Sequence, residues 1–328
     1  MENSIENDKG FSGIKNLGNT CFLNSCIQVL SHTYELNKLL TDMPPPPPPP
    51  TLDGEQVSPN EENTPDTDSC LLTKEYSDLI RLMWVQNGIL TPNRFIYVVQ
   101  HVAQNKNKEM FTGFAQNDAT EFLQFLVDCL ENACDHKITA LFYGKLASTI
   151  CSVGGDTAAP TIVSKQTEPF FILNVPIPPS PNPTINECIA KFTDCEVLDG
   201  DNKWYNETTK QYEDVIKKYD FEELPPILVI VIKRFHHINK NEVLVSFGEF
   251  LEFSSGGGAT TTKYDLYGVC NHFGNAFFGH YTAFVKHNSG QWIHFNDHIV
   301  EKVPEFSNIV SPHAYCLFYR RRAEENLS

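Results

Sequence analysis

The chain has 328 residues, of which 41% are hydrophobic and 20% charged, so most of it should fold around a substantial core. Acidic residues exceed Lys and Arg by 41 to 25, and this net charge of −16 argues against a general nucleic-acid-binding protein. The longest aliphatic run, residues 227–232, has six residues. A membrane-spanning helix needs ~20, so we expect no membrane segment.

The cysteines indicate a compartment rather than a metal site. Ten are present, and no two lie three positions apart, so the sequence has no Cys-x-x-Cys metal-binding pair. The first residues lack the apolar core of a secretory signal, and thiols without such a signal should stay reduced. We therefore expect an intracellular protein, cytoplasmic, nuclear or both, with no metal and no cofactor.

The chain begins with a loose polar tail over residues 1–10, followed by turn-forming residues over 11–20. Apolar residues then recur at helical spacing from Cys21 onward, and Thr20 is a candidate cap for this helix. The pattern places Cys21 in the first helical turn.

Residues 44–70 are predicted to form an exposed insertion. Pro44–Pro50 is an unbroken run of seven prolines, and residues 51–70 contain six acidic residues and no Lys or Arg. We favour a solvated spacer. The alternative is a docking site for a polyproline-binding module with an aromatic groove.

Helical patterns continue to about residue 142, and the clearest amphipathic helix covers 117–134, with Asn117 or Asp118 as its cap. Short β-rich stretches follow at 146–151, 170–175, 227–233, 243–253, 263–270, 280–286, 291–296 and 313–319. Helices first and strands later predict an α+β fold, with a helical part packed against an antiparallel sheet.

Two distant segments carry residues suited to thiol chemistry. A helix N-terminus favours a thiolate, which makes Cys21 a candidate nucleophile. His280 opens a predicted hairpin that ends at Asn296 and Asp297. If Lys286 pairs with Gly290, His280 lies opposite Asn296, and a shift by one residue places Asp297 opposite instead. Either register gives His280 a polar partner that orients it.

Several segments of the sequence resemble motifs of a known family, the ubiquitin-specific proteases. Asn16-Leu-Gly-Asn-Thr-Cys21-Phe-Leu-Asn-Ser resembles their Cys box, and Gly279-His280-Tyr-Thr-Ala-Phe with Trp292-Ile-His-Phe-Asn296-Asp297 resembles their His box. The segments Gln116-Asn-Asp118-Ala-Thr-Glu121-Phe-Leu, Pro225 to Phe235 and Ala314 to Arg320 are similar to motifs found between and after the boxes. The likeness runs in order from about residue 11 to 321.

The resemblance implies a papain-like cysteine protease with a helical thumb, an antiparallel β palm and β fingers. It implies one catalytic domain over 11–328, with the thumb in 11–142 and the fingers and palm in 143–328. The implied activity is hydrolysis of the isopeptide bond after the C-terminal glycine of ubiquitin.

The resemblance also implies roles for single residues. Cys21 is the nucleophile, His280 the base, Asn296 or Asp297 the group that orients it, and Asn16 a donor to the oxyanion. Asp118 and Glu121 would contact the basic tail of ubiquitin, and Gln116, Phe278, Gly279 and Tyr281 would line its channel. Helix capping explains Asp118 and Glu121 equally well.

Many members of this family bind zinc in the fingers through two Cys-x-x-Cys pairs. Here the first region retains only Cys151 and the second has no cysteine, so we expect no zinc. Alternatives to a deubiquitinase are a protease for a ubiquitin-like modifier and a catalytically silent ubiquitin-binding scaffold.

Overall fold

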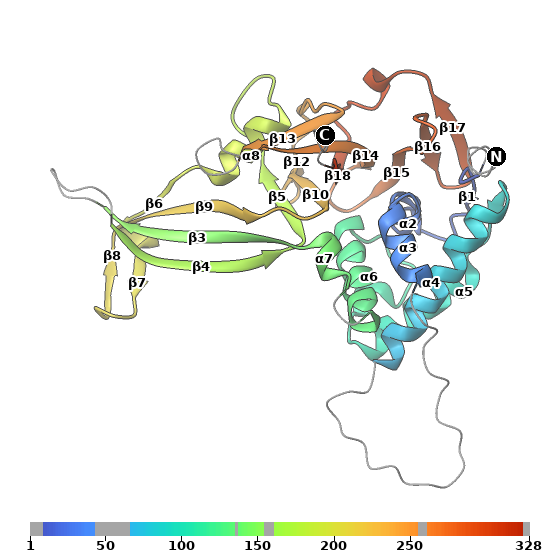
Figure 1. The fold of residues 1–328 in the computed structure, drawn as a ribbon, viewed down its shortest axis with the longest axis horizontal. Coiled ribbons are helices and arrows are strands. Elements are labelled where there is room, and N and C mark those ends of the chain that lie inside the picture. Colours follow the sequence, from blue (N-terminus) through green and yellow to red (C-terminus); the bar gives the residue numbers. More distant parts are fainter. Residues whose placement is uncertain (1–8, 43–65, 135–136, 154–160, 255–260, 324–328) are drawn as a thin grey trace, which may run out of the picture. The chain divides into compact units, whose positions relative to one another are not determined.

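The computed structural model describes residues 9–42, 66–134, 137–153, 161–254 and 261–323. Its backbone packs as two compact units: unit 1 combines residues 1–141 and 267–309, and unit 2 combines 142–266 and 310–328. The α+β class is confirmed, because helices dominate the first part and strands the second (Figure 1). The division into a thumb at 11–142 and fingers with palm at 143–328 stays a prediction.

The helical part of unit 1 contains more helices than the periodicity indicated. The segment at 34–42 was not predicted, and residues 67–70 begin a long helix rather than ending an insertion. The helices are α2 (Cys21–Ser31), α3 (Tyr34–Asp42), α4 (Thr67–Val85), α5 (Asn93–Asn105), α6 (Ala119–Ala133) and α7 (Thr139–Phe142), with a short 3-10 turn at Glu109–Phe111.

Helix α2 is buried along its whole length and packs against α6 and two strands of the same unit, β15 (Gly279–Lys286) and β16 (Trp292–Asn296) (Figure 1). Thr20 precedes the helix as predicted, but its side chain does not cap it. Its hydroxyl instead accepts from the Leu17 amide at 3.0 Å and donates to Asn16 Oδ1 at 3.3 Å. The hydroxyl therefore stabilises the preceding loop.

The strands of unit 1 form an antiparallel array and a separate parallel pair. β15 pairs with the end of β14 (Thr261–Gly274) on one side and with β16 on the other, and β16 pairs with β17 (Ile299–Val303). Near the N-terminus, β1 (Gly13–Ile14) pairs in parallel with β2 (Ile89–Leu90).

Both predicted registers of the β15–β16 hairpin are wrong. Lys286 pairs with Trp292, and His287 N donates to Gln291 O at 2.9 Å, so three residues form the loop. Gly290 in this loop has a φ of 84°, a conformation that glycine adopts without strain. His280 consequently lies opposite Phe273 of β14 and is a diagonal neighbour, not a direct partner, of the end of β16.

Unit 2 contains a four-stranded antiparallel sheet in the order β4-β3-β9-β6. Figure 1 shows β3 (Gly144–Ser152), β4 (Ile162–Phe170) and β9 (Val215–Glu223) running side by side as a long ribbon. β6 (Glu196–Leu198) extends one edge, and β7 (Trp204–Asn206) and β8 (Gln211–Glu213) form a small hairpin. β4, β9 and β17 were missed, because their exposed residues interrupt the apolar pattern.

The remainder of unit 2 is built on β10 (Ile227–Lys233), whose first six residues are all buried. It pairs antiparallel with β18 (Ala314–Arg321) and parallel with β5 (Ile172–Pro176), so the predicted antiparallel sheet contains a parallel pair here. The other elements of unit 2 are α8 (Ile185–Thr193), β13 (Phe250–Ser254), the hairpin of β11 (Phe235–His236) with β12 (Asn239–Lys240), and a 3-10 turn at Gly200–Asn202. A further 3-10 turn at Phe306–Asn308 belongs to unit 1.

Two predictions cannot be followed in full. The proline run Pro44–Pro50 lies outside the described residues, as does the tail except for Lys9 and Gly10. Within the described part of the chain, no helix is long and apolar enough to cross a membrane.

Candidate active site

Cys21 is the first residue of α2, where the sequence placed it, and only 4% of its surface is exposed. The free amides at a helix N-terminus favour a negative charge on a group placed there. Every residue of α2 is buried, so the position of the thiol is fixed by packing along the whole helix.

His280 and Asn296 meet through their side chains although they are not paired in the ladder. The ring Nε2 of His280 lies 2.7 Å from Oδ1 of Asn296. An amide oxygen only accepts hydrogen bonds, so Nε2 carries the proton and donates it. This fixes the tautomer of a neutral ring and leaves Nδ1 for the thiol of Cys21.

The surroundings of His280 favour its charged form. A hydrogen bond with the Cys21 thiol raises the pKa of His280, and the bond to Asn296 acts in the same direction. Partial burial opposes both, and the resulting pKa is about 9. The charge of Asp297 acts in the same direction. At neutral pH the ring is therefore held as an imidazolium beside the thiol, the pairing that a thiolate nucleophile requires.

Asp297 contacts a different group from Asn296. Its Oδ2 accepts from Asn16 Nδ2 at 3.1 Å, and its Oδ1 accepts from Asn24 Nδ2 at 2.8 Å. Its φ of 51° lies in the left-handed region that Asp and Asn tolerate better than most residues. Its carbonyl accepts from Ile14 N at 2.9 Å. Asp297 thus connects the β16–β17 turn to the Cys box, and holds Asn16 rather than His280.

Asn16 has one hydrogen-bond donor left near Cys21. Its Oδ1 accepts from the amides of Gly18 and Thr20, both at 3.1 Å, which fixes the loop before α2. One amide hydrogen goes to Asp297. An amide group carries two hydrogens, so the second is available to an oxygen placed beside Cys21.

The Gln116–Glu121 segment reaches the His box in two places. Gln116 Oε1 accepts from the backbone amide of Gly279 at 2.8 Å, and Tyr281 donates from its hydroxyl to Asp118 Oδ2 at 3.3 Å. Asp118 also caps α6, accepting from the Thr120 amide at 2.7 Å, so the capping prediction for this residue is confirmed. These contacts fix the start of β15, where His280 lies.

Gly279 permits a close approach that no other residue allows. A Cβ added at this position would lie 2.1 Å from Nε2 of the buried His272 and 2.7 Å from the Phe273 carbonyl. Either distance is well inside van der Waals contact, so a side chain at 279 would displace the start of β15 and with it His280.

Other predicted site residues are exposed. Phe278 is 72% exposed and follows a turn in which Asn275 Oδ1 accepts from the amides of Phe277 and Phe278. This turn is short, because residues up to Gly274 belong to β14 and β15 begins at Gly279. Glu121 also faces solvent, in the first turn of α6. Phe278 and Glu121 are accessible to a ligand.

No described group of three or more His, Cys, Asp and Glu side chains is arranged to hold a metal ion. Cys151 lies near the end of β3, half-buried, and all ten cysteines are free thiols. The residues of this chain therefore do not fit the four-cysteine zinc site that many ubiquitin-specific proteases have in their fingers.

Asn24 is the site residue that sequence reasoning missed. It is 2% exposed, and besides Asp297 its Nδ2 lies 3.4 Å from the carbonyls of Ile14 and Lys15. The available signal was its position, three residues after Cys21 and so on the same face of the helix. A polar side chain there needs a buried partner.

Comparison with known proteins gives consistent matches over almost the whole chain. The family model described as "Ubiquitin carboxyl-terminal hydrolase" matches residues 12–319. The Drosophila melanogaster protein "Ubiquitin carboxyl-terminal hydrolase Usp2" is 31% identical over 96% of this chain and 35% of its own length. Human "Ubiquitin carboxyl-terminal hydrolase 2" is 30% identical over 95% of this chain and 55% of its own length. The chain thus spans between a third and just over half of these relatives.

Solved structures share the fold. A chain of the SAGA Ubp8/Sgf11/Sus1/Sgf73 DUB module bound to ubiquitin aldehyde matches with a TM-score of 0.73 and 24% identity, over 97% of this chain and 71% of that one. The module bound to monoubiquitin gives 0.74 and 23%, over 97% and 70%. These likenesses confirm the papain-like fold with thumb, palm and fingers. On the family match and the two relatives, the chain belongs to the ubiquitin carboxyl-terminal hydrolase family.

Proposed function

We propose that this protein is a cysteine-type deubiquitinase, which hydrolyses the peptide or isopeptide bond after the C-terminal glycine of ubiquitin. The observation that carries the proposal is the His280 ring, held by Asn296 at 2.7 Å, with the Cys21 thiol as the first cause of its raised pKa. Its family and its named relatives support ubiquitin as the substrate.

In the proposed reaction, the Cys21 thiolate attacks the carbonyl carbon of the terminal glycine. The His280 imidazolium gives its proton to the departing amine, and a thioester to Cys21 remains. Neutral His280 then takes a proton from water, which attacks the thioester and releases the carboxylate and the thiol. The bond from Nε2 to Asn296 keeps the ring oriented through both steps.

Two further roles concern charge. We assign Asn16 as the donor to the oxyanion, since its second amide hydrogen is uncommitted, and Asp297 as the residue that positions Asn16. We assign Glu121 to the basic tail of ubiquitin, because this carboxylate is exposed. Asp118 already accepts from Thr120 and Tyr281, so its role is to position α6 and β15.

The remaining assignments are proposals of the same kind. We propose that residues 11–328 act as one catalytic domain, and that Phe278, Gly279, Tyr281 and Gln116 line the tail channel. Ten free cysteines support an intracellular location, in the cytoplasm, nucleus or both. A polyproline-binding partner at Pro44–Pro50 stays a prediction.

The test is covalent labelling by ubiquitin that bears a C-terminal electrophile, on wild type and Cys21→Ala, with Cys26→Ala as the matched control on the same helix. We expect labelling of wild type and Cys26→Ala only. Labelling of Cys21→Ala would remove the nucleophile assignment. No labelling of folded wild type would favour the silent scaffold, and labelling by a ubiquitin-like probe alone would favour a protease for that modifier.

A further inference from the structure

A groove lies between α3 and α4, built from residues that the proposed reaction does not use. It has a volume of about 690 Å³, within the range of ligand-binding pockets, and its walls belong to unit 1. The lining runs along α4 from Tyr76 to Val85. Nine residue steps of helix correspond to ~14 Å, which is the length of about four residues of extended peptide.

The floor of the groove is apolar and aromatic. Tyr76 and Ile80 of α4 are buried beneath it. The ring of Trp84 lies 5.8 Å from that of Tyr34 of α3, at 75° to it, and its Nε1 is held by the Ser31 carbonyl at 3.1 Å. Val85, at the end of the lining, is 60% exposed. This floor is suited to one large apolar side chain.

The rim of the groove is cationic, in contrast to the net charge of −16. Lys9, Lys38 and Arg81 line it, and neither Lys9 nor Lys38 has a carboxylate partner among the described residues. Asp78 is the acidic residue in the described lining. The groove therefore favours an anionic ligand that most of the molecule would repel.

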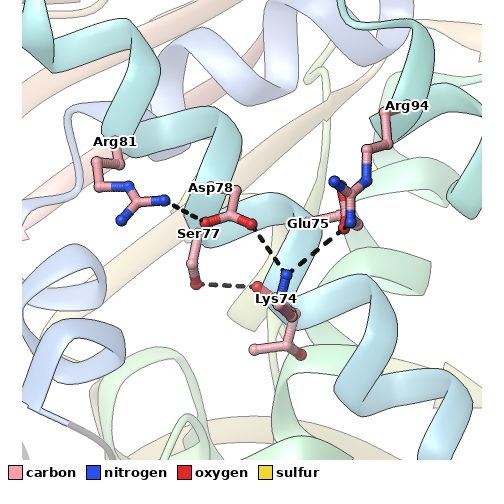
Figure 2. A network of polar contacts seen from close by, with 7 residues as sticks. Lys74, Glu75, Ser77, Asp78, Arg81 and Arg94 are labelled. Carbon is pink, nitrogen blue, oxygen red and sulfur yellow. Dashed lines mark hydrogen bonds and ion pairs between the residues drawn. The ribbon is translucent and has the colours of Figure 1, made fainter. Parts of the chain in front are cut away.

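The charge of Asp78 is already compensated. Figure 2 shows Arg81 and Lys74 both reaching this carboxylate, at 2.7 and 3.2 Å. Beyond Lys74, Glu75 pairs with Arg94 of α5 at 2.6 Å. Because Arg81 uses one Nη for Asp78, its other guanidinium hydrogens remain able to donate to a ligand carboxylate.

From these features we propose that the α3–α4 groove binds a protein partner through an acidic peptide segment of about four residues that carries one large apolar side chain. The apolar side chain lies on Trp84 and Tyr34, and its acidic neighbours pair with Lys9, Lys38 and Arg81. Such a site would recruit a substrate or an adaptor separately from the ubiquitin tail, and it is independent of the proposed hydrolysis.

The test is calorimetric titration of the full chain with acetyl-Glu-Glu-Leu-Glu-Glu-amide. We expect saturable binding of one peptide per chain, weakened at least about tenfold when Gly replaces Leu in the peptide, since a buried leucine side chain is lost. The Lys9→Glu/Lys38→Glu variant should bind at least about tenfold more weakly, because two attractive charges become repulsive.

The matched control is Lys108→Glu/Lys302→Glu, which makes the same change in net charge at exposed positions outside the groove. It should bind within about twofold of wild type. Equal weakening of the two variants, or no saturable binding, would overturn the proposal. A gain of more than about tenfold on deleting residues 44–65 would also overturn it, since the chain's own acidic segment would then be the occupant. Hydrolysis of a ubiquitin-amide substrate should be unchanged in both variants.

Discussion

The cluster around Cys21 and the β3–β4–β9 ribbon are held together in different ways. In the cluster, side chains bond to side chains across long separations in the sequence: Asn16 and Asn24 both reach Asp297, which is 281 and 273 residues away. In the ribbon, the backbone ladder carries the structure, and β4 is exposed along most of its length. We expect single side chains to matter greatly in the first region and little in the second.

The largest expected effect is at His280. Replacing it with Ala removes the group that holds the Cys21 proton, and kcat/KM for a ubiquitin-amide substrate should fall about 10³-fold or more. The control is His298→Ala, an exposed histidine that follows Asp297 in the same turn, which should stay within about threefold of wild type. Comparable losses in the two variants would mean that the turn, not the ring of His280, is what catalysis needs.

The next largest effect distinguishes Asn296, the last residue of β16, from Asp297, which follows it. Asn296→Ala should lower kcat/KM about 10²-fold, and more than Asp297→Ala, because only Asn296 bonds to the His280 ring. With a His280 pKa of about 9, activity should fall as the pH rises through that value. The bond to Asn296 raises this pKa, so its loss should move the alkaline limb to lower pH.

Asn296→Asp provides the control, because a carboxylate still accepts from Nε2. It should keep most of the rate, and its negative charge should hold the alkaline limb at or above the wild-type position. A larger loss in Asp297→Ala, accompanied by the larger shift of that limb, would contradict the geometry and make Asp297 the partner of His280.

The sequence predicts this part of the site well, but not how it is connected. Cys21 at a helix start and His280 at a strand start follow from local patterns. The prediction of a partner for His280 depended on the register of the hairpin. In the structure His287 pairs with Gln291, so the loop differs from the one assumed for either predicted register. A one-residue change in loop length alters every opposed pair, and the residue types in the turn allow several lengths.

The fold, too, could be predicted from the sequence only in part. Strong periodicity identified α6 and the buried run of β10, since both bury apolar residues at a regular spacing. β4 and β9 were missed because a mostly exposed ribbon has little reason to alternate apolar and polar residues. Helix α3 was missed for a related reason, since Leu36 is its only buried residue among those described.

A moderate effect on stability is expected from Asn24, whose contribution the sequence did not indicate. Asn24→Ala leaves Asp297 Oδ1 without its donor at 2.8 Å and should reduce the free energy of unfolding by about 1–3 kcal/mol. The rate should fall about tenfold because Asp297 no longer holds Asn16 firmly. Thermal unfolding and kcat/KM measure the two effects, and Ser25→Ala, a buried neighbour whose hydroxyl donates to the Phe22 carbonyl, is the control. An unchanged rate in Asn24→Ala would break the connection from Asn24 to the oxyanion donor.

The smallest effect is expected in the ribbon. Lys165 pairs with Glu222 at 2.5 Å, but both side chains face solvent, where ion pairs contribute little. Lys165→Ala should therefore leave the melting temperature unchanged. EDTA should also leave it unchanged, since the described residues offer no metal site. Ala147→Asp is the contrasting variant, because it places an unpaired carboxylate on a fully buried position of β3 and should lower the melting temperature strongly. If Lys165→Ala proved as damaging as Asn24→Ala, the ribbon would depend on single side chains as the cluster does, and the distinction between the two regions would fail.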